Sequence, residues 1–537
     1  MSDLVHTGRL LRGQFDTPPH VADLGFAAAV RSKGDRVWEP TCGPGSFLHA
    51  ALRSGHPPDR LLGTEIDAAR LEAARRTLPS VDLRLADLFA LTPRKLGLFD
   101  AVVGNPPFVR PERIDRGDRR RIRAAVAAST GFEAPAKADL AVLALLHCTA
   151  FLAPGGRLSF VMPNSWMDAD FGAPVRRFLL RDHRLVRIVE SRDDPWFPEV
   201  SLNTVVVVLE RTSEREPTEF VQLRGGTRHV HRADAPEGRW TIPLRAPKVW
   251  WAVTRASAGR LRPLGDLADL GYGTKVGIAP FFTPRAPDGA DVEDRWRRPF
   301  LRSLRGLHRY EVRRSDVSGV LLDFSADPAA AADPARNPGA AAWIHQGETR
   351  RNRGGRPYPE VPSVRHHRPW YALREVRTGP LLVPQFRAER HYILANPGAV
   401  PVNNSAWYAR WRAPIDPDLV GGLLNCTWMA LAAEVLGRTN LGEGLLTLYG
   451  PDLKALPVPD VASPDIAAAF RTIKGRAVLP LREELRLDDR AALDCAVGRA
   501  LGLSSSTMED VRSAALRMLE ERCGLAEKLR SARGRRA

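Results

Sequence analysis

The sequence predicts an α/β fold with a doubly wound, mostly parallel sheet, and two observations support this prediction. In the first half of the 537 residues, short apolar runs alternate with helical segments, strand after helix after strand. Beyond about residue 240 this alternation fades, and Gly, Pro and Arg become dense. The sheet is therefore expected in the first half of the chain, and a separate, less regular structure in the second.

The elements of the first half follow in a regular order. The predicted strands are 36–40, 60–67, 81–89, 98–108, 157–167, 184–191 and 202–211. The predicted helices are 46–55, 68–78 and 138–156. Gly55 is expected to end the first helix, and a Pro-Gly-Gly sequence to end the long apolar helix over 138–156. Strands joined by helices in this way lie parallel in one sheet.

Three segments are expected along the chain. The first domain covers 1–244, a second domain of mixed α and β structure covers 245–460, and a helical segment with amphipathic periodicity covers 461–537. Within the second domain, the Ala- and Pro-rich run over 327–343 has the composition of an insertion or a mobile loop. No internal repeat is evident.

The charge of the chain indicates a polyanionic partner. Lys and Arg number 79 against 62 Asp and Glu, which gives a net charge of +17. A bias in base composition would replace Lys by Arg but would not create this excess of basic residues. Nucleic acid is therefore the expected partner.

Composition also excludes several classes of protein. The five cysteines are scattered, without the spacing of a metal site or a disulfide framework, so we expect no metal and a reducing cytoplasm. No apolar run approaches the ~20 residues of a membrane span. The N-terminal residues lack the apolar core of a signal peptide.

A glycine-containing loop, EPTCGPGSFL over 39–48, joins the first strand to the first helix. Gly43 and Gly45 would let the backbone pass close beneath a ligand, at the amide groups of a helix N-terminus. A dinucleotide fingerprint would need a small residue at position 48, where this chain has Leu48. The loop therefore favours a cofactor other than NAD.

Acidic residues end the next two strands. Glu65 and Asp67 lie at the tip of the second strand, where carboxylates can accept hydrogen bonds from both hydroxyls of a ribose. Asp87 ends the third strand, where it could accept a hydrogen bond from the amino group of an adenine. Any one such acid could simply cap a helix. Their order after a glycine loop indicates a cofactor that contains adenosine.

The fourth strand ends in Asn105, Pro106, Pro107 and Phe108. This run can be a plain turn, since Asn and Pro end strands routinely. It can also hold a flat, amine-bearing group. The Asn105 side-chain oxygen and the Pro106 carbonyl are acceptors for two N–H groups, the prolines fix the direction of that carbonyl, and Phe108 offers a stacking face. Aligned methyl transfer to such an amine needs no covalent intermediate.

With these motifs, the chain resembles the γ-class adenine-N6 DNA methyltransferases of type II restriction-modification systems, which carry a C-terminal target-recognition domain. The matching motifs, in family order, are GQFDTPPHVADL at 13–24, EPTCGPGSF, TEID, ADLF and NPPF. Glu39 stands where the family usually has Asp, and Phe108 where it usually has Tyr. Both departures are compatible with activity, whereas Pro44 removes a backbone donor from the glycine loop.

The resemblance implies a Rossmann-like domain dependent on S-adenosyl-L-methionine. The implied cofactor contacts are Thr17, Pro18, Glu39, Pro40, Gly43, Gly45, Glu65, Ile66, Asp67, Asp87, Leu88 and Asn105. The implied catalytic residues are Asn105, Pro106, Pro107 and Phe108, and the segment WFPEVSLN implies that Phe197 stacks on the target base together with Phe108. Trp196 is the alternative to Phe197. In the second half, GYGTKVGIAPFF over 271–282 and the segment 423–460 resemble the opening and closing parts of the DNA-reading domain.

Two basic segments are candidates for DNA contact. One follows the proposed pocket at 110–124, and the other, at 349–371, has interleaved aromatic residues. A solvated helix face is the alternative interpretation of the first. The candidate DNA-binding residues are Arg110, Arg113, Arg119, Arg120, Lys275, Arg353 and Arg356.

The expected function is therefore methyl transfer from S-adenosyl-L-methionine to the N6 of an adenine flipped out of double-stranded DNA, in restriction-modification or host defence. The expected location is the cytoplasm, on the nucleoid through DNA. The alternatives are cytosine-N4 methylation, methylation of RNA or of a protein glutamine, and a non-catalytic DNA-binding protein. No nuclease motif is evident, so a cognate endonuclease would be a separate protein.

Overall fold

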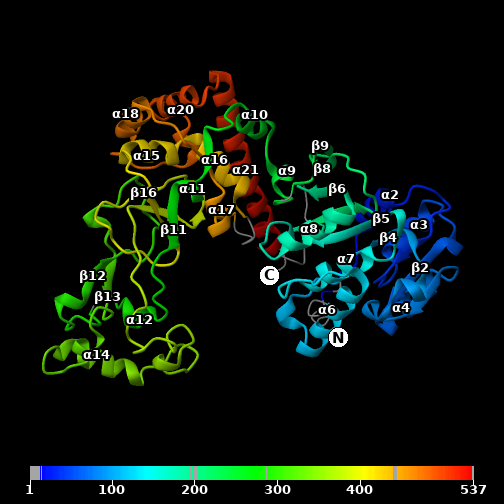
Figure 1. Ribbon diagram of the computed structural model, residues 1–537, viewed down its shortest axis with the longest axis horizontal. Helices are drawn as coiled ribbons and strands as arrows, with labels where there is room; N and C mark the ends of the chain where they lie inside the picture. The colour runs from blue at the N-terminus through cyan, green and yellow to red at the C-terminus, as the bar shows by residue number, and fades with distance from the viewer. Residues whose placement is uncertain are drawn as a thin grey trace. The chain divides into compact units, whose positions relative to one another are not determined.

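The computed structural model describes residues 13, 15–192, 196–197, 203–236, 238–285, 287–438 and 444–534 (Figure 1). The chain divides into two compact units, Met1–Ala246 and Pro247–Ala537. The first unit contains the large sheet, and the second contains several smaller ones.

In the first unit, the described residues form one nine-stranded sheet in the order β3-β2-β1-β4-β5-β7-β6-β8-β9. The strands are β1 Val37–Glu39, β2 Leu61–Glu65, β3 Asp82–Leu85, β4 Phe99–Gly104, β5 Leu152–Pro163, β6 Arg184–Ser191, β7 Thr204–Glu210, β8 Thr218–Arg224 and β9 Thr227–Ala233. Strands β3, β2, β1, β4 and β5 are parallel, and β7 lies antiparallel between β5 and β6. The predicted doubly wound sheet is confirmed, with its switch point between β1 and β4.

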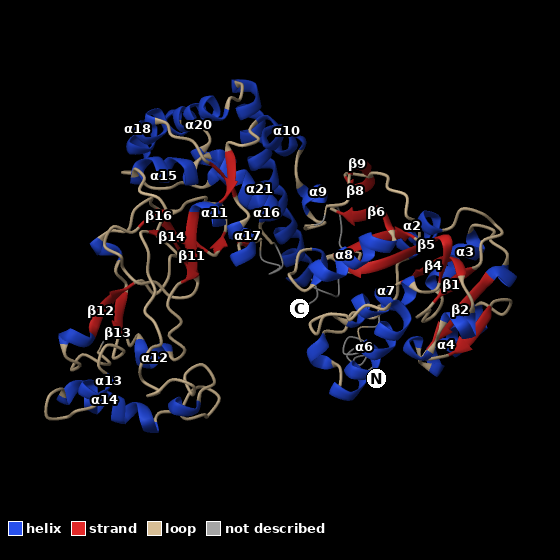
Figure 2. Cartoon of the chain, viewed as in Figure 1, coloured by secondary structure: helices blue, strands red, loops and turns tan. Residues whose placement is uncertain are grey.

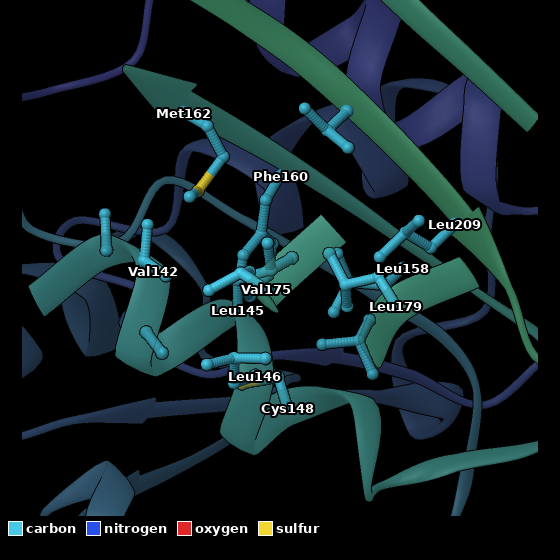
Figure 3. Packing of buried hydrophobic residues seen from close by; sticks show 14 of the residues in the cluster. Val142, Leu145, Leu146, Cys148, Leu158, Phe160, Met162, Val175, Leu179 and Leu209 are labelled. Carbon is cyan, nitrogen blue, oxygen red and sulfur yellow. The ribbon is translucent and has the colours of Figure 1, made fainter. Parts of the chain in front are cut away.

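Helices cover both faces of this sheet. They are α2 Pro19–Ala29, α3 Ser46–Arg53, α4 Ala68–Thr77, α5 Pro93–Leu96, α6 Arg116–Thr130, α7 Leu140–Thr149, α8 Gly172–Asp182 and α9 Ile242–Arg245. Neighbouring residues along β5 point to opposite faces, so that Phe160 joins one apolar cluster and Val161 the other. Figure 3 shows the first cluster, in which Val142 and Leu145 of α7 pack near Phe160.

The helix predicted over 138–156 is shorter in the structure. Helix α7 ends at Thr149, and β5 already begins at Leu152, opposite Phe99 of β4. The Phe99 amide donates to the Phe151 carbonyl at 2.9 Å. Gly155, at a φ of 74°, allows the chain to bend within β5, where the register with β4 shifts. The Pro-Gly-Gly sequence thus lies inside a bulged strand.

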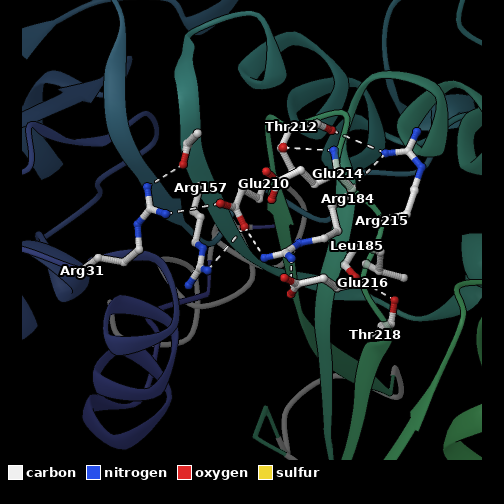
Figure 4. A network of polar contacts seen from close by, with 11 residues as sticks. Arg31, Arg157, Arg184, Leu185, Glu210, Thr212, Glu214, Arg215, Glu216 and Thr218 are labelled. Carbon is white, nitrogen blue, oxygen red and sulfur yellow. Dashed lines mark hydrogen bonds and ion pairs between the residues drawn. The ribbon is translucent and has the colours of Figure 1, made fainter.

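A carboxylate at the end of β7 gathers three arginines, as Figure 4 shows. Glu210 is only 7% exposed, and its oxygens accept from Arg31 at 3.2 Å, Arg157 at 3.3 Å and Arg184 at 2.6 Å. Arg31 follows α2, whereas Arg157 and Arg184 belong to the strands on either side of β7. The network therefore ties the N-terminal helical segment to the sheet.

The second unit is a mixture of short strands and helices, as the sequence predicts (Figure 2). Its strands are β10 Leu261–Pro263, β11 Ala268–Tyr272, β12 Arg297–Phe300, β13 Gly319–Leu322, β14 Leu381–Pro384, β15 Phe386–Arg387, β16 Leu394–Ala395, β17 Ala406–Trp411, β18 Leu446–Thr447 and β19 Pro457–Pro459. Its helices are α10 Lys248–Ala256, α11 Leu264–Leu267, α12 Ala279–Phe282, α13 Pro328–Ala331, α14 Pro338–Thr349, α15 Pro417–Asn425, α16 Thr427–Leu436, α17 Gly450–Lys454, α18 Pro464–Ile473, α19 Leu481–Glu484, α20 Asp488–Leu501 and α21 Ser505–Gly534. The C-terminal helices belong to this unit, since α18 packs on α15 and α21 on α16.

The Ala-rich run over 327–343 is ordered structure, contrary to the expected insertion or mobile loop. It forms α13 and the start of α14, and Ala340 and Trp343 are buried in an apolar cluster with Phe281. The side-chain amide of Asn337 donates from Nδ2 to the Ala330 carbonyl at 2.7 Å and so joins the two helices. Alanine is a strong helix former, and here it faces a core.

Two further findings concern the described residues alone. No single helix among them is long and apolar enough to cross a membrane, although the bent pair α15 and α16, broken by 54°, passes this test together by length and composition. No group of three His, Cys, Asp or Glu in the described ranges could hold a metal ion.

Candidate active site

A cavity of about 440 Å³ opens in the first unit where β1, β2, β3 and β4 end. Because this is the switch point of a parallel sheet, the cavity lies where α/β folds bind ligands. Of the predicted cofactor residues, Thr17, Glu39, Pro40, Glu65, Ile66, Asp87, Leu88 and Asn105 line it, together with the predicted catalytic residue Pro107. Pro18, Gly43, Gly45 and Asp67 are not part of its lining.

The glycine loop takes its shape from two left-handed residues. Gly43 has a φ of 54° and Gly45 a φ of 88°, and Gly45 is the N-cap of α3. The Gly43 amide donates to the Glu65 carboxylate at 2.8 Å. A Cβ at position 43 would collide with the guanidinium of Arg70. The backbone angle therefore favours glycine here, and a larger residue would also displace the Arg70 side chain.

Glu39 lies beneath the loop and is 2% exposed. Its carboxylate accepts from the amides of Phe47 at 3.4 Å and Leu48 at 3.1 Å, in the first turn of α3. Burial raises the pKa of this carboxyl well above its ordinary value, against the lowering effect of the two amides. The site thus holds a buried acid at the bottom of the cavity.

The two acids that follow β2 have different roles in the structure. Glu65 faces the cavity and accepts from the amides of Ile66 and Asp67 at 2.9 Å, in addition to Gly43. Asp67 instead caps α4, where its side chain accepts from the Arg70 amide at 3.2 Å. The structure therefore brings Glu65, and not Asp67, to the cavity.

Asp87 stands at the cavity wall after β3, as expected. Its carboxylate accepts from the Phe89 amide at 3.0 Å and from Arg121 of α6 at 2.7 Å. Arg121 also lines the cavity, and sequence reasoning did not single it out. The one available signal was the density of arginines directly after the catalytic motif.

The Asn105 side chain has one end occupied and one end open. Its Nδ2 donates to the Phe15 carbonyl at 3.1 Å. Because a carbonyl oxygen can only accept a hydrogen bond, the atom that faces Phe15 must be the Nδ2 donor and not the Oδ1 acceptor. Its Oδ1 is buried and has no hydrogen-bond partner. A buried acceptor without a donor destabilises the fold, so Oδ1 is available to accept a hydrogen bond from a ligand.

The N-terminal segment also holds the backbone of the catalytic motif. The Phe108 amide donates to the Gly13 carbonyl at 3.1 Å, and Gly13 has a φ of 66°. A Cβ at position 13 would lie 2.8 Å from the backbone of Phe108. Gly13, Phe15 and Asp16 line the cavity as well. Sequence reasoning placed this segment near the cofactor but missed its contact with the catalytic loop.

Three phenylalanines meet beside Asn105. The ring centroids of Phe108 and Phe197 lie 6.1 Å apart with an interplanar angle of 83°, and Phe15 lies 5.9 Å from Phe108 and 6.3 Å from Phe197. Both predicted stacking residues are thus together, edge to face.

The predicted DNA contacts lie in several places. Arg110, Arg113 and Arg120 are exposed, and Arg113 also lines the cavity. Arg119 is half-buried and donates to the Pro111 carbonyl. In the second unit, Lys275, Arg353 and Arg356 are exposed. Arg353 and Arg356 belong to a tight turn in which Asn352 accepts from the amides of Gly354 and Arg356 at 3.0 Å.

Comparison with known families agrees with this site. Residues 65–197, from the end of β2 past the catalytic motif, match the model of the Eco57I restriction-modification methylase family. This part of the chain is therefore similar to that family.

Individual relatives cover more of the chain. It is 26% identical over 340 residues to the type II methyltransferase M.XhoI of Xanthomonas vasicola, which covers 57% of this chain and 59% of that protein. It is 29% identical over 185 residues to M.TthHB8I of Thermus thermophilus, which covers 33% of this chain and 40% of that protein. The chain therefore matches about two-fifths to three-fifths of the length of these relatives.

A solved structure resembles nearly the whole chain. The type IIL restriction-modification enzyme MmeI, determined in complex with DNA, matches with a TM-score of 0.54 and 14% identity. The match covers 92% of this chain and 70% of that one. At this identity the likeness shows the fold alone.

Proposed function

We propose that this protein is a site-specific DNA methyltransferase that transfers a methyl group from S-adenosyl-L-methionine to the N6 of a flipped-out adenine. The observation that carries the proposal is the buried, unpaired Oδ1 of Asn105, fixed in direction at the edge of a nucleotide-sized cavity. The family of residues 65–197 supports a methylase.

The cavity fits the proposed cofactor. Its volume of about 440 Å³ lies within the range of small-molecule sites. Ile66 offers an apolar surface, 64% exposed, between Glu65 and the wall that carries Asp87. Glu65 would bind the ribose hydroxyls, Asp87 the adenine amine and Glu39 the cationic end of the methionine part. When bound, the cofactor supplies a methyl group activated by a sulfonium.

The residues of the catalytic motif would prepare the acceptor. The amine of adenine is a weak nucleophile because its lone pair is delocalised into the ring. Asn105 Oδ1 and the Pro106 carbonyl would each accept a hydrogen bond from one of its two N–H groups. This arrangement favours a tetrahedral nitrogen whose lone pair is available for the methyl group. The Phe15 carbonyl keeps the amide in this orientation. Phe108 and Phe197 would hold the base after it leaves the stack.

Double-stranded DNA is the proposed substrate, bound chiefly through arginines. The excess of basic residues supports binding to phosphates. In the second unit, the turn with Arg353 and Arg356 presents exposed cations on a backbone held by Asn352. Some of these arginines would read base edges and others would hold phosphates.

Cytosine-N4 methylation is the second candidate, since its exocyclic amine offers the same two donors to Asn105 and Pro106.

We also propose that a separate restriction endonuclease recognises the unmodified site. The proposed location of the protein is the cytoplasm, on DNA.

Mapping of modified bases by single-molecule sequencing tests the proposal. The chain is expressed in cells without DNA methylation, beside Asn105→Ala. We expect N6-methyladenine in one recurring sequence, and none with the variant. N4-methylcytosine would change the base and keep the mechanism. Absence of both, with protein that binds S-adenosyl-L-methionine, would refute a DNA substrate.

A further inference from the structure

An ion pair joins the N-terminal segment to helix α4 in the lining of the cavity. Arg70, in the first turn of α4, donates from Nη2 to Asp16 Oδ1 at 2.7 Å. Both residues line the cavity, and they come from segments that lie 54 positions apart in the sequence. The Arg70 side chain is 14% exposed, whereas that of Asp16 is 48% exposed. The guanidinium is therefore mostly buried, whereas the side chain of its partner is half-exposed.

The position of Arg70 is fixed by the glycine loop. Its guanidinium packs so close to Gly43 that a Cβ there would overlap it. Arg70 thus lies against the glycine loop, and both Arg70 and Glu39 line the cavity. Two other arginines line the cavity in the described residues, Arg113 and Arg121, and both come from the segment after the catalytic motif.

The charges in the cavity are complementary to a zwitterion. Arg121 is bound to Asp87 at the end proposed for adenine. The glycine loop packs against the guanidinium of Arg70, and the helix that follows the loop holds the acid Glu39 at its first amides. The methionine part of the proposed cofactor carries one ammonium and one carboxylate. A guanidinium is the side chain whose paired donors match a carboxylate best.

We infer that Arg70 binds the carboxylate of the methionine part of the cofactor, and that Asp16 holds Arg70 in place until the cofactor arrives. This rests on the function proposed above. A pair with one half-exposed partner contributes little to stability, so exchange of the Asp16 carboxylate for that of the cofactor is inexpensive. Asp16 lies between Phe15 and Thr17, so the exchange acts on the segment that orients Asn105.

Ligand truncation tests this inference without any methyl transfer. Isothermal titration calorimetry on the full chain compares S-adenosylhomocysteine with its decarboxylated analogue. The wild type is expected to bind the carboxylate-bearing ligand about tenfold more tightly. Arg70→Gln should bring this ratio close to one, and Arg70→Lys to an intermediate value. Arg76→Gln, an exposed arginine on the same helix, should keep the wild-type ratio.

The outcomes separate the inference from the proposed function. An unchanged ratio in Arg70→Gln would overturn the role of Arg70 and leave the methyltransferase intact. A wild type that binds neither ligand would overturn both. Should Arg70→Gln fail to fold in thermal melts, Asp16→Asn decides, because it keeps Arg70 and removes the competing carboxylate. We then expect the ratio to rise above that of the wild type, and an equal or smaller ratio would contradict the exchange.

Discussion

The Nδ2 of Asn105 donates to the carbonyl oxygen of Phe15 at 3.1 Å, across 90 positions of sequence. This contact gives the N-terminal segment two roles. The same segment accepts the Phe108 amide at Gly13 and contributes Asp16 and Thr17 to the cavity wall. A single short segment therefore touches both the catalytic motif and the cofactor cavity, which links the orientation of Asn105 to the shape of that cavity.

Gly13→Ala should separate catalysis from cofactor binding. The added Cβ meets the Phe108 backbone, and the φ of 66° is unfavourable for alanine. Displacement of the catalytic loop should lower the rate of methyl transfer about 10- to 100-fold. The affinity for S-adenosylhomocysteine, measured by calorimetry, should change less than about threefold because Glu39 and Glu65 keep their positions. Gly34→Ala, an exposed glycine of the same unit, serves as control.

An equal loss of rate and of cofactor affinity in Gly13→Ala would contradict this role, since it would indicate a general collapse of the site.

Phe108→Ala should weaken the hold on the target base. Stacking of a base on an aromatic side chain contributes about 1–3 kcal/mol, so the catalytic efficiency toward DNA should fall about 5- to 150-fold. Steady-state kinetics with a duplex substrate measures this effect. Phe132→Ala removes a ring stacked on Phe178 at 4.6 Å, away from the cavity lining, and should lower stability without this loss. Equal kinetic losses in both variants would argue that Phe108 acts only through packing.

The sequence predicted the elements whose signals are local. Alternating apolar runs revealed the sheet, and Gly43 and Gly45 revealed the tight loop, because each depends on neighbouring residues. The predicted end of the helix over 138–156 was wrong, because a buried helix and a buried strand share the same continuous apolar composition. The prediction of an insertion or mobile loop over 327–343 was wrong, because the alanines of this run pack against aromatic residues that are distant in the sequence.

The parts of the site that could not be predicted are pairings between distant segments. Arg121 meets Asp87 from 34 positions away, and Arg70 meets Asp16 from 54. Nothing in the local sequence distinguishes these arginines from the arginines beside them. Asp67 shows the opposite case, since an acid after a strand can bind a ligand or cap a helix, and here it caps α4.

Arg353→Gln and Arg356→Gln should weaken DNA binding and reduce its dependence on salt. Removal of one arginine–phosphate interaction should make the slope of log affinity against log salt about 0.9 less steep. Fluorescence anisotropy with a labelled duplex at several salt concentrations gives this slope. Arg336→Gln removes an exposed arginine of the same unit that pairs with Asp333, and should leave the slope unchanged. An unchanged slope in both turn variants would place the DNA elsewhere.

Glu39→Gln should change how stability depends on pH. Burial raises the pKa of this carboxyl in the folded state above its usual 4.5, so the folded protein favours the protonated form. Its contribution to stability is therefore fully present below about pH 4.5 and is lost as the pH rises through the folded pKa. Glutamine stays neutral at every pH and so avoids this loss, while its one oxygen can still accept from either the Phe47 or the Leu48 amide.

The variant should therefore melt higher than the wild type at pH 8, by about 2–4 °C for each kcal/mol gained in a unit of this size. The difference should shrink steadily toward pH 5, as thermal melts across this range would show. Binding of S-adenosylhomocysteine should weaken at the same time, because the variant has no carboxyl that could ionise beside the ammonium of the bound ligand. A melting difference that is constant with pH would show that Glu39 is ionised in the fold.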